Sequence, residues 1–112
     1  MNRIDHHTEK AVRRFLELIG NRYDVATAMV YGSRARGTHR PDSDADLAVL
    51  LRGTRHRFLA AKLDMADTAF DVLLETGILI SPLPLWLDEW EQPDNHTNPA
   101  LLRNIAREGV PV

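Results

Sequence analysis

Asp44 and Asp46 are the first residues in this sequence that could do chemistry, because they lie in a stretch that otherwise has the composition of a strand, DADLAVLL. Side chains alternate along a strand, so both carboxylates are expected on one face. Two like charges placed together repel each other and lose hydration, and they need a cation or hydrogen-bond donors beside them. Mg²⁺ prefers one or two carboxylates, completed by water and substrate phosphates. The pair therefore predicts a divalent-metal site.

Gly32 and Ser33 are separated from this pair by ten residues, and they directly follow an apolar stretch that predicts a strand. Glycine permits a tight turn and close approach of the backbone. The N–H groups that follow, together with the Ser33 hydroxyl, can donate to an anion at a helix start. Arg34 and Arg36 add positive charge, and phosphate contact and a solvated surface position are equally open for each. A phosphate site and a metal site on neighbouring strands are the groups that nucleotidyl transfer needs.

Purely structural roles are the alternative for these residues. Asp44 and Asp46 could be a helix cap and a turn residue, with the strand starting later, and Gly32-Ser33 could be an ordinary turn. The joint spacing favours the chemical interpretation over these.

The elements that must position these residues follow from apolar periodicity and from Gly and Pro. We predict, in order, a helix with Thr8 as N-cap, a strand, a short irregular or helical segment, a loop, a strand, a long helix, a strand, a loop and a helix. These cover residues 8–19, 25–31, 32–37, 38–43, 44–51, 56–75, 78–85, 88–97 and 100–108. The order predicts one α/β domain over residues 1–112, with a short sheet packed by helices.

Two apolar segments carry expectations about packing. The long helix should have one core face and one solvated face, and its pattern rests on apolar residues at Leu59, Ala60, Leu63, Ala66, Phe70, Leu73 and Leu74. The stretch PLPLWLDEW contains Trp86 and Trp90, and it either packs against the C-terminal helix or forms an exposed patch for a protein partner. The prolines of ILISPLPL place that strand at a sheet edge or end it early.

Composition narrows the function classes. A net charge of −2 offers no general attraction to nucleic acid, so direct nucleic-acid binding is not expected. There is no cysteine, which excludes disulfides and thiolate metal sites. No apolar run approaches the roughly 20 residues of a membrane span, and the polar N-terminus lacks a signal-peptide core. We expect a cytoplasmic protein with no membrane partner.

The spacing GS-x10-DxD, formed by Gly32-Ser33 and Asp44-Ala45-Asp46, resembles the motif of the DNA polymerase β-like nucleotidyltransferase superfamily. The surrounding words GSRARG and SDADLAV look like its small stand-alone members, the minimal nucleotidyltransferases or MNT proteins. The resemblance implies the polymerase β-like αβ fold with a short mixed sheet. It also implies Mg²⁺ held by the two aspartates, and contacts from Gly32 and Ser33 to the triphosphate of ATP.

The same resemblance implies a partner. Many stand-alone members are antitoxins paired with a HEPN-domain toxin, a helical RNase, and some transfer AMP from ATP to a tyrosine of that toxin. We therefore expect an AMP-transferring antitoxin, in an oligomer with itself or with its partner.

One departure from the superfamily keeps alternatives open. A third carboxylate usually lies on the next strand, but ILISPLPL has none, and Glu75 and Asp88-Glu89 only flank it. One alternative is a weak or inactive MNT domain that neutralises its HEPN partner by binding. The other is a small-molecule transferase of the aminoglycoside type.

Overall fold

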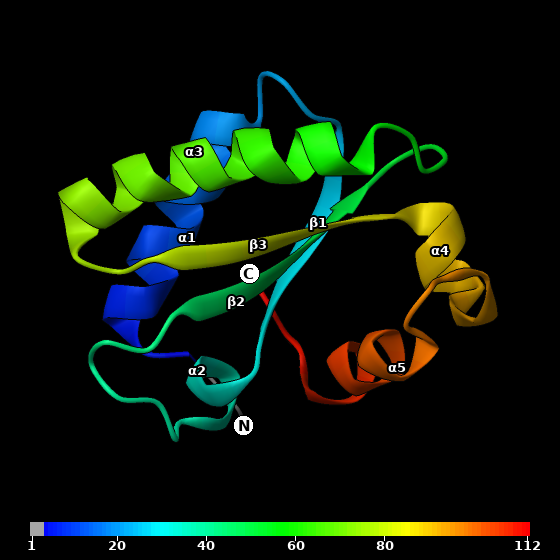
Figure 1. The fold of residues 1–112 in the computed structure, drawn as a ribbon. Coiled ribbons are helices and arrows are strands. Elements are labelled where there is room, and N and C mark those ends of the chain that lie inside the picture. The colour runs from blue at the N-terminus through cyan, green and yellow to red at the C-terminus, as the bar shows by residue number, and fades with distance from the viewer. Residues whose placement is uncertain (1–3) are drawn as a thin grey trace.

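Helices and strands alternate along the chain, as Figure 1 shows for this computed structural model, which describes residues 4–112. The elements are α1 (His6–Ile19), β1 (Val25–Tyr31), α2 (Ser33–Arg36), β2 (Ala45–Leu51), α3 (Phe58–Thr76), β3 (Ile80–Trp86), α4 (Leu87–Glu91), the 3₁₀ helix η1 (Pro93–Asn95), α5 (Pro99–Glu108) and β4 (Val110–Pro111). Strand β1 has the predicted bounds, and β2 begins one residue later than predicted. Within residues 4–112, no helix is both long and apolar enough to cross a bilayer.

The four strands form one mixed sheet in the order β3-β2-β1-β4. Strand β1 runs antiparallel to β2 and to β4, whereas β2 and β3 are parallel. The antiparallel β1–β2 pair brings the end of β1 beside the start of β2, with Tyr31 opposite Asp46. This pairing is what unites the two halves of the sequence motif, and it confirms the short mixed sheet packed by helices.

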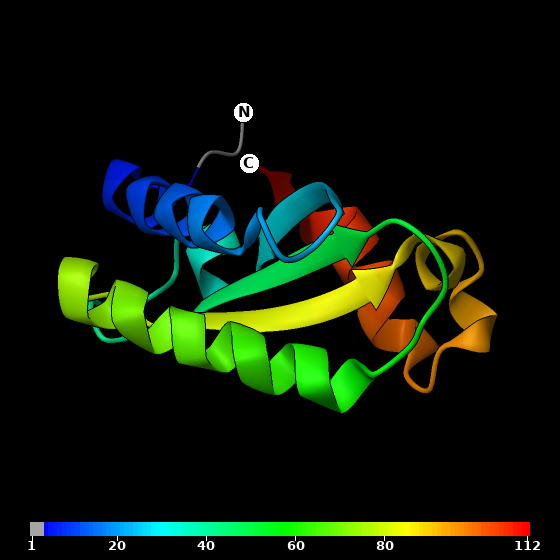
Figure 2. The same cartoon turned by 90° about the horizontal axis from the view of Figure 1, so that it is seen from above.

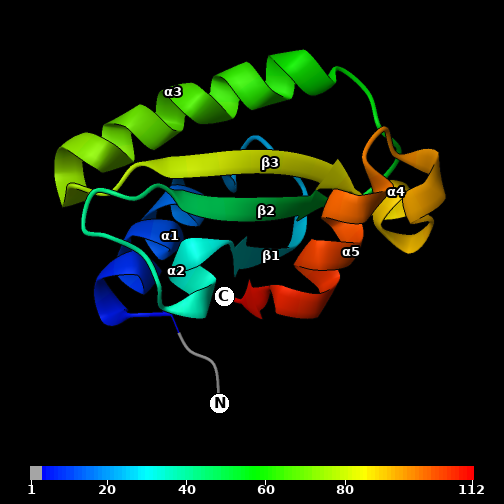
Figure 3. The same ribbon diagram turned by 60° about the horizontal axis from the view of Figure 1, so that its bottom comes forward.

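Two helical layers cover the two faces of the sheet (Figures 2 and 3). Helices α1 and α3 pack on the face that includes Leu47 and Val49 of β2. Ala48 and Leu50 face the other way and pack against Leu102 and Ile105 of α5. On that second face, α5 and α4 lie at one end of the sheet and α2 lies at the other, next to the start of β2 (Figure 3).

Strand β3 forms one edge of the sheet, as its prolines predict. The N–H of Ala45 donates to the carbonyl of Leu79 at 2.9 Å, so alternate residues from Leu79 onward turn their backbone polar groups toward β2. Pro82 and Pro84 are the residues between, and they face outward. Because proline has no N–H, it interrupts no hydrogen bond with β2 there.

Helix ends differ from the predicted ones where a side chain caps the backbone. Asp5, not Thr8, is the N-cap of α1, because its carboxylate accepts the Thr8 N–H at 2.7 Å and the Thr8 hydroxyl at 2.9 Å. The predicted loop 88–97 contains α4 and η1. There the carboxylate of Glu89 accepts the N–H of Trp86 at 3.2 Å and holds the first turn of α4.

Helix α3 buries a different face from the predicted one. Its buried residues are Ala61, Met65, Thr68, Ala69 and Val72. Four of the large apolar residues that defined the predicted core pattern are instead exposed: Leu59, Leu63, Phe70 and Leu74. The small side chains of the buried face let the helix lie close against the sheet.

The tryptophan-containing segment is packed, not exposed. Trp86 is 3% exposed and belongs to the core beneath α1 and α3. Trp90 packs with Leu85 and Leu102 on the α5 side. Packing against the C-terminal helix is therefore confirmed for Trp90 and not for Trp86, which packs on the opposite face of the sheet. The exposed patch for a protein partner was the wrong alternative for this segment.

Candidate active site

Gly32 and Asp46 form the centre of the site. Gly32 follows β1 with φ +74° and ψ −153°, a conformation open in practice only to glycine. A Cβ atom added at Gly32 would overlap Oδ2 of Asp46. The carboxylate thus lies against the bare backbone of the turn, in space that any other residue would fill.

The two aspartates lie at the start of β2. Asp44 immediately precedes the strand and is exposed, whereas Asp46 is the second strand residue and is half-buried. Asp46 shares its face of β2 with Ala48 and Leu50, the face opposite α1 and α3. Burial raises the pKa of Asp46, the charge of Asp44 raises it further, and the charge of Arg36 partly offsets both. The two carboxylates are therefore close enough to repel each other.

This donor set fits a divalent cation. Within residues 4–112, the carboxylate groups of Asp44 and Asp46 take part in no hydrogen bond or ion pair with another side chain or with the backbone. Ionised carboxylates only accept hydrogen bonds, and here two of them meet with no donor between them. Hard oxygen ligands of this kind suit Mg²⁺, which takes its other ligands from water and substrate phosphates.

Ser33 begins α2, a helix of four residues. The N–H groups of Ala35 and Arg36 both bond to the carbonyl of Gly32 at 3.1 Å. Among the described residues, this leaves the N–H groups of Ser33 and Arg34, with the Ser33 hydroxyl, as donors beside Asp46 that have no acceptor. These three donors could hold an anion next to the carboxylate pair.

The side chain of Arg34 has another role from the predicted phosphate contact. It is 4% exposed, and it donates to the carbonyl of Ser43 at 2.8 and 3.0 Å, to that of Pro41 at 3.2 Å and to the hydroxyl of Thr8 at 2.8 Å. The guanidinium thereby ties the loop before β2 to the first turn of α1. It holds the loop that leads to the aspartates, and its donors are already engaged by these protein acceptors.

Arg36 remains the cation near the site. Its side chain is 52% exposed and its Nη1 lies 3.2 Å from Oε2 of Glu108, at the end of α5. Its charge also acts on Asp46, as the pKa of that carboxyl shows. An exposed arginine with one surface partner can turn to a phosphate at little cost.

Tyr31 is a site residue that the sequence interpretation missed. It is paired with Asp46 across the two strands. Burial raises the pKa of Tyr31 to about 12, and the charge of Asp46 contributes to that shift. Its position directly before Gly32 was the only sequence signal. That position indicates a site residue only once the strand register, which pairs Tyr31 with Asp46, is known.

No acid occupies the neighbouring strand at the level of Asp46. The residue of β3 paired with Asp46 is Ser81. Glu75 is bound to Arg14 of α1 at 2.9 Å, near the end of α3. Glu89 is buried at the other end of β3, where it pairs with Arg55 at 3.0 Å. The predicted gap in the carboxylate set is therefore confirmed, with a serine at the position in question.

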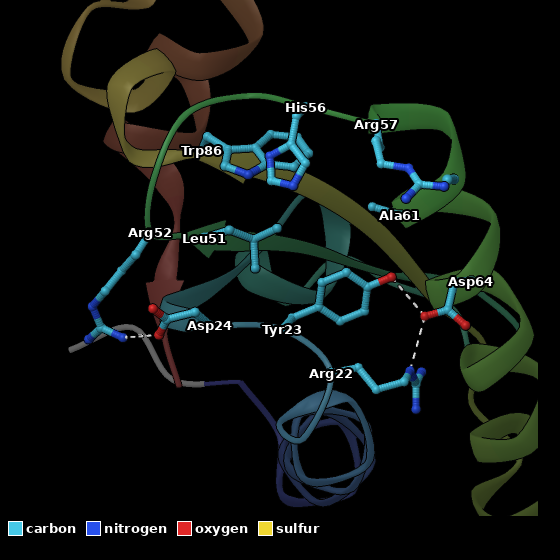
Figure 4. Close-up of a pocket in the computed structure, with 11 residues that line it drawn as sticks. Arg22, Tyr23, Asp24, Leu51, Arg52, His56, Arg57, Ala61, Asp64 and Trp86 are labelled. Atoms are coloured by element: carbon cyan, nitrogen blue, oxygen red, sulfur yellow. Dashed lines mark hydrogen bonds and ion pairs between the residues drawn. The ribbon is translucent and has the colours of Figure 1, made fainter.

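A separate hollow of about 430 Å³ lies at the opposite end of the sheet (Figure 4). In it Asp64 accepts hydrogen bonds from Arg22 at 3.1 Å and from the Tyr23 hydroxyl at 2.7 Å, and Arg52 donates to Asp24 at 2.6 Å. These charges satisfy one another across the α1–β1 turn, β2 and α3. The hollow shares no residue with the Gly32–Asp46 site.

Comparisons with known proteins agree with this geometry. The sequence profile of the family described as "Polymerase beta, Nucleotidyltransferase" matches residues 15–80, which include both halves of the motif and more than half of the chain. The crystal structure of a candidate nucleotidyltransferase from Sulfolobus solfataricus is similar, with a TM-score of 0.53 and 17% identity over 99% of this chain and 89% of that one. At that identity the likeness shows the fold, which confirms the expected polymerase β-like architecture. A comparison with curated protein sequences gives no match. On the evidence of the motif, the sheet and the matched profile, the chain belongs to the polymerase β nucleotidyltransferase family.

Proposed function

We propose that this chain is a Mg²⁺-dependent nucleotidyltransferase that moves AMP from ATP to a hydroxyl of a partner protein. The observation that supports it most is the carboxylate pair: neither Asp44 nor Asp46 has a side-chain partner among the described residues, the two are close enough for the charge of Asp44 to act on Asp46, and Asp46 lies against the bare backbone of Gly32. Two like charges kept together weaken a fold, so their presence suits a site that a ligand completes.

Each residue of the site has a role in this proposal. Asp44 and Asp46 hold Mg²⁺, while the donors at Ser33 bind the phosphates and Arg36 adds positive charge at the rim. Bound Mg²⁺ would orient the α-phosphate and stabilise the charge that builds up on it. Gly32 keeps the turn thin enough for the phosphates to approach the carboxylates.

The reaction balances without a third acid. The acceptor oxygen forms a bond to the α-phosphorus, the bond from that phosphorus to the β-phosphate oxygen breaks, and pyrophosphate leaves. With Ser81 opposite Asp46, the acceptor proton goes to water. A tyrosine is the acceptor that this arrangement favours, because its reference pKa of about 10 makes it a far better acid than a sugar hydroxyl.

A tyrosine of a HEPN-domain toxin is the acceptor that the resemblance to stand-alone antitoxins supports. The net charge of −2 argues against a polynucleotide acceptor. Covalent modification of the toxin by AMP would then be the antitoxin activity.

A second candidate function is neutralisation of the same toxin by contact alone. Ser81 is the specific observation in its favour, because it leaves the site without a general base, whose help is typically worth about 10²–10⁴-fold in rate. The carboxylate pair opposes this candidate, since binding alone has no use for it.

Intact-mass spectrometry of a HEPN-domain toxin separates the two functions. The toxin is incubated with this chain, ATP and Mg²⁺, and a mass gain of one AMP or a multiple is expected. Asp44→Asn/Asp46→Asn should abolish the gain, and Asp42→Asn, an exposed aspartate of the same loop, should preserve it. An unmodified toxin that both the wild-type chain and the double variant still silence would overturn the transferase and support binding alone.

A further inference from the structure

The outer side of α3 carries an apolar stripe. Leu59, Leu63, Phe70 and Leu74 are 64%, 59%, 55% and 71% exposed, and Ala66, also exposed, lies between Leu63 and Phe70. Their spacing repeats every three or four residues, so all five lie along one side of the helix. At 1.5 Å per residue this α3 stripe is about 22 Å long.

The stripe is distinct from the face that builds the core. Ala61, Met65, Ala69 and Val72 turn inward and are at most 6% exposed, so α3 is apolar on two opposite sides. A helix that lies on the surface normally presents charged and polar residues to water on its outer side. Four large apolar side chains in a row on an outer face mark a surface that another molecule covers.

Charges flank the stripe unevenly. Asp67 and Asp71 follow one side of it, about 60° and 100° round the helix axis from Phe70, and both are exposed. Among residues 4–112 neither forms an ion pair, unlike Asp64 and Glu75 on the same flank, which bind arginines of α1 and of the turn after it. The opposite flank has one cation, Lys62.

This asymmetry disfavours a second copy of the chain as the occupant. A two-fold pair uses the same patch on both copies. With the two α3 helices antiparallel, the acidic flanks meet each other and repel. With the helices parallel, the acidic flank meets a flank that has only Lys62 to answer two aspartates. Complementarity instead requires a surface that brings its own positive charges.

We propose that the α3 stripe docks an amphipathic helix of a partner protein, with an apolar face that covers Leu59 to Leu74 and with lysine or arginine residues that meet Asp67 and Asp71. A helix laid along a helix of about 22 Å matches the length and straightness of the stripe. The ion pairs at the rim fix the direction of the docked helix and speed its association.

The docked helix would leave the nucleotide site open. Helix α3 covers the sheet face that includes Leu47 and Val49 (Figures 2 and 3). Asp46 alternates with these residues along β2 and therefore faces the opposite side. A partner held on α3 therefore leaves Asp46, Ser33 and Arg36 accessible, whereas Asp44 lines a hollow with Lys62, Ala66 and Ala69 and lies near the edge of the docking surface. This inference does not depend on the proposed transfer reaction.

A pair of synthetic peptides tests the proposal. Both peptides are about 20 residues long, which is enough for a helix, and both have leucines along one side. One peptide carries lysines beside the leucines, and the other carries glutamates at the same positions. Fluorescence anisotropy with the wild-type chain should show the lysine peptide binding at least about tenfold more tightly than the glutamate peptide. Hydrogen exchange on the complex should show protection along 59–74.

Variants of exposed residues make the test specific. Leu63→Ser/Phe70→Ser should abolish binding, and Asp67→Lys/Asp71→Lys should reverse the preference between the peptides. Arg13→Ser on the outer side of α1 is the control and should change neither. Equal affinity of both peptides, or no binding of either, would overturn the proposal. So would sedimentation of the wild-type chain as a dimer that Leu63→Ser/Phe70→Ser converts to a monomer, since the second copy would then be the occupant.

Discussion

The carboxylate of Asp46 lies against the Cα of Gly32, the residue that directly follows the neighbouring strand β1, with no room for a side chain between them. A single methyl group at Gly32 would displace one of the two proposed metal ligands. Gly37, at the other end of α2, has a similar positive φ of +77° but open space around it. Alanine at Gly37 would therefore cause backbone strain alone, whereas alanine at Gly32 would cause backbone strain and also displace Asp46.

Gly32→Ala should destroy nucleotide binding, while Gly37→Ala should keep it. The backbone conformations cost the alanines about 2 and about 1 kcal/mol of stability respectively. Only at Gly32 does the added methyl meet Asp46. Urea denaturation measures the first effect, and calorimetric titration with ATP and Mg²⁺ measures the second. Normal ATP affinity in folded Gly32→Ala would show that Asp46 does not have to lie against the turn.

Asp46→Asn should abolish metal binding without lowering the stability of the metal-free protein. Burial and the charge of Asp44 raise the pKa of Asp46, so the ionised carboxylate disfavours the folded state at neutral pH. In EDTA the variant should melt at or above the temperature of the wild-type chain. Added Mg²⁺ should raise only the wild-type melting temperature, and transfer should fall by about 100-fold or more in the variant. A variant that melts lower than wild type in EDTA would contradict this account of the pair.

Substitution of Arg34 should mainly lower stability, whereas substitution of Arg36, two positions later, should mainly lower ATP affinity. Arg34→Met leaves the buried Thr8 hydroxyl and the part-buried carbonyl of Ser43 without their donor, and we expect a loss of about 3 kcal/mol in the free energy of unfolding. Arg36→Met removes one exposed ion pair and should cost about 0.5 kcal/mol. ATP affinity should fall in folded Arg36→Met. Denaturation curves and calorimetry on both variants check this, and a stable Arg34→Met would show that the loop needs no anchor.

Ser81→Asp should raise the rate of transfer. The residue is paired with Asp46 on the parallel strand, so a carboxylate there completes the set that this family usually has. General-base help of about 100-fold is a reasonable gain. Single-turnover transfer to the toxin measures it, with Ser81→Asn as the uncharged control of the same size. Equal rates in the two variants would mean that deprotonation of the acceptor does not limit the reaction.

The Tyr23–Asp64 hydrogen bond should shape the pH dependence of stability. The bond lowers the pKa of Asp64, so its stabilisation is present above the usual carboxyl pKa and is lost as pH falls through the lowered value. Burial and Asp64 raise the pKa of Tyr23 to about 12, so that contribution is present below about pH 10 and is lost as pH rises toward 12. Tyr23→Phe should flatten both limbs of the urea midpoint plotted against pH. A variant curve parallel to that of wild type would refute this.

The motif and the strands that carry it could be predicted from the sequence because both depend on residues that are close together along the chain. A β-branched apolar run with clear turn residues at both ends fixed β1 at its observed bounds. The closeness of Gly32 to Asp46 could be inferred from two strands joined by a short connection, since Tyr31, just before Gly32, pairs with Asp46. The absence of an acid on β3 was also visible as composition, and the structure added only that Ser81 stands opposite Asp46.

Long-range packing decided what the sequence could not. Helical periodicity identifies where apolar residues recur, and α3 has apolar residues on two sides. The side with the larger residues was predicted to be the core face. The side that packs on the sheet is instead the one with Ala61 and Ala69. The side chain of Arg34 is buried because it donates to three acceptors, the Thr8 hydroxyl and the carbonyls of Pro41 and Ser43. These acceptors come together only when α1 packs beside the loop before β2. No local pattern distinguishes it from Arg36, which stays in solvent.

The prolines of β3 limit how this protein can aggregate. An edge strand normally offers a row of donors and acceptors on which a strand from another molecule can grow. Pro82 and Pro84 remove the donors from the middle of that row, because they are the residues whose backbone faces outward. At the other edge β4 is two residues long. Neither edge of the sheet therefore offers a continuous row of free backbone donors to a strand of another molecule, and the largest exposed apolar side chains lie on a helix, whose backbone groups are already bonded within it.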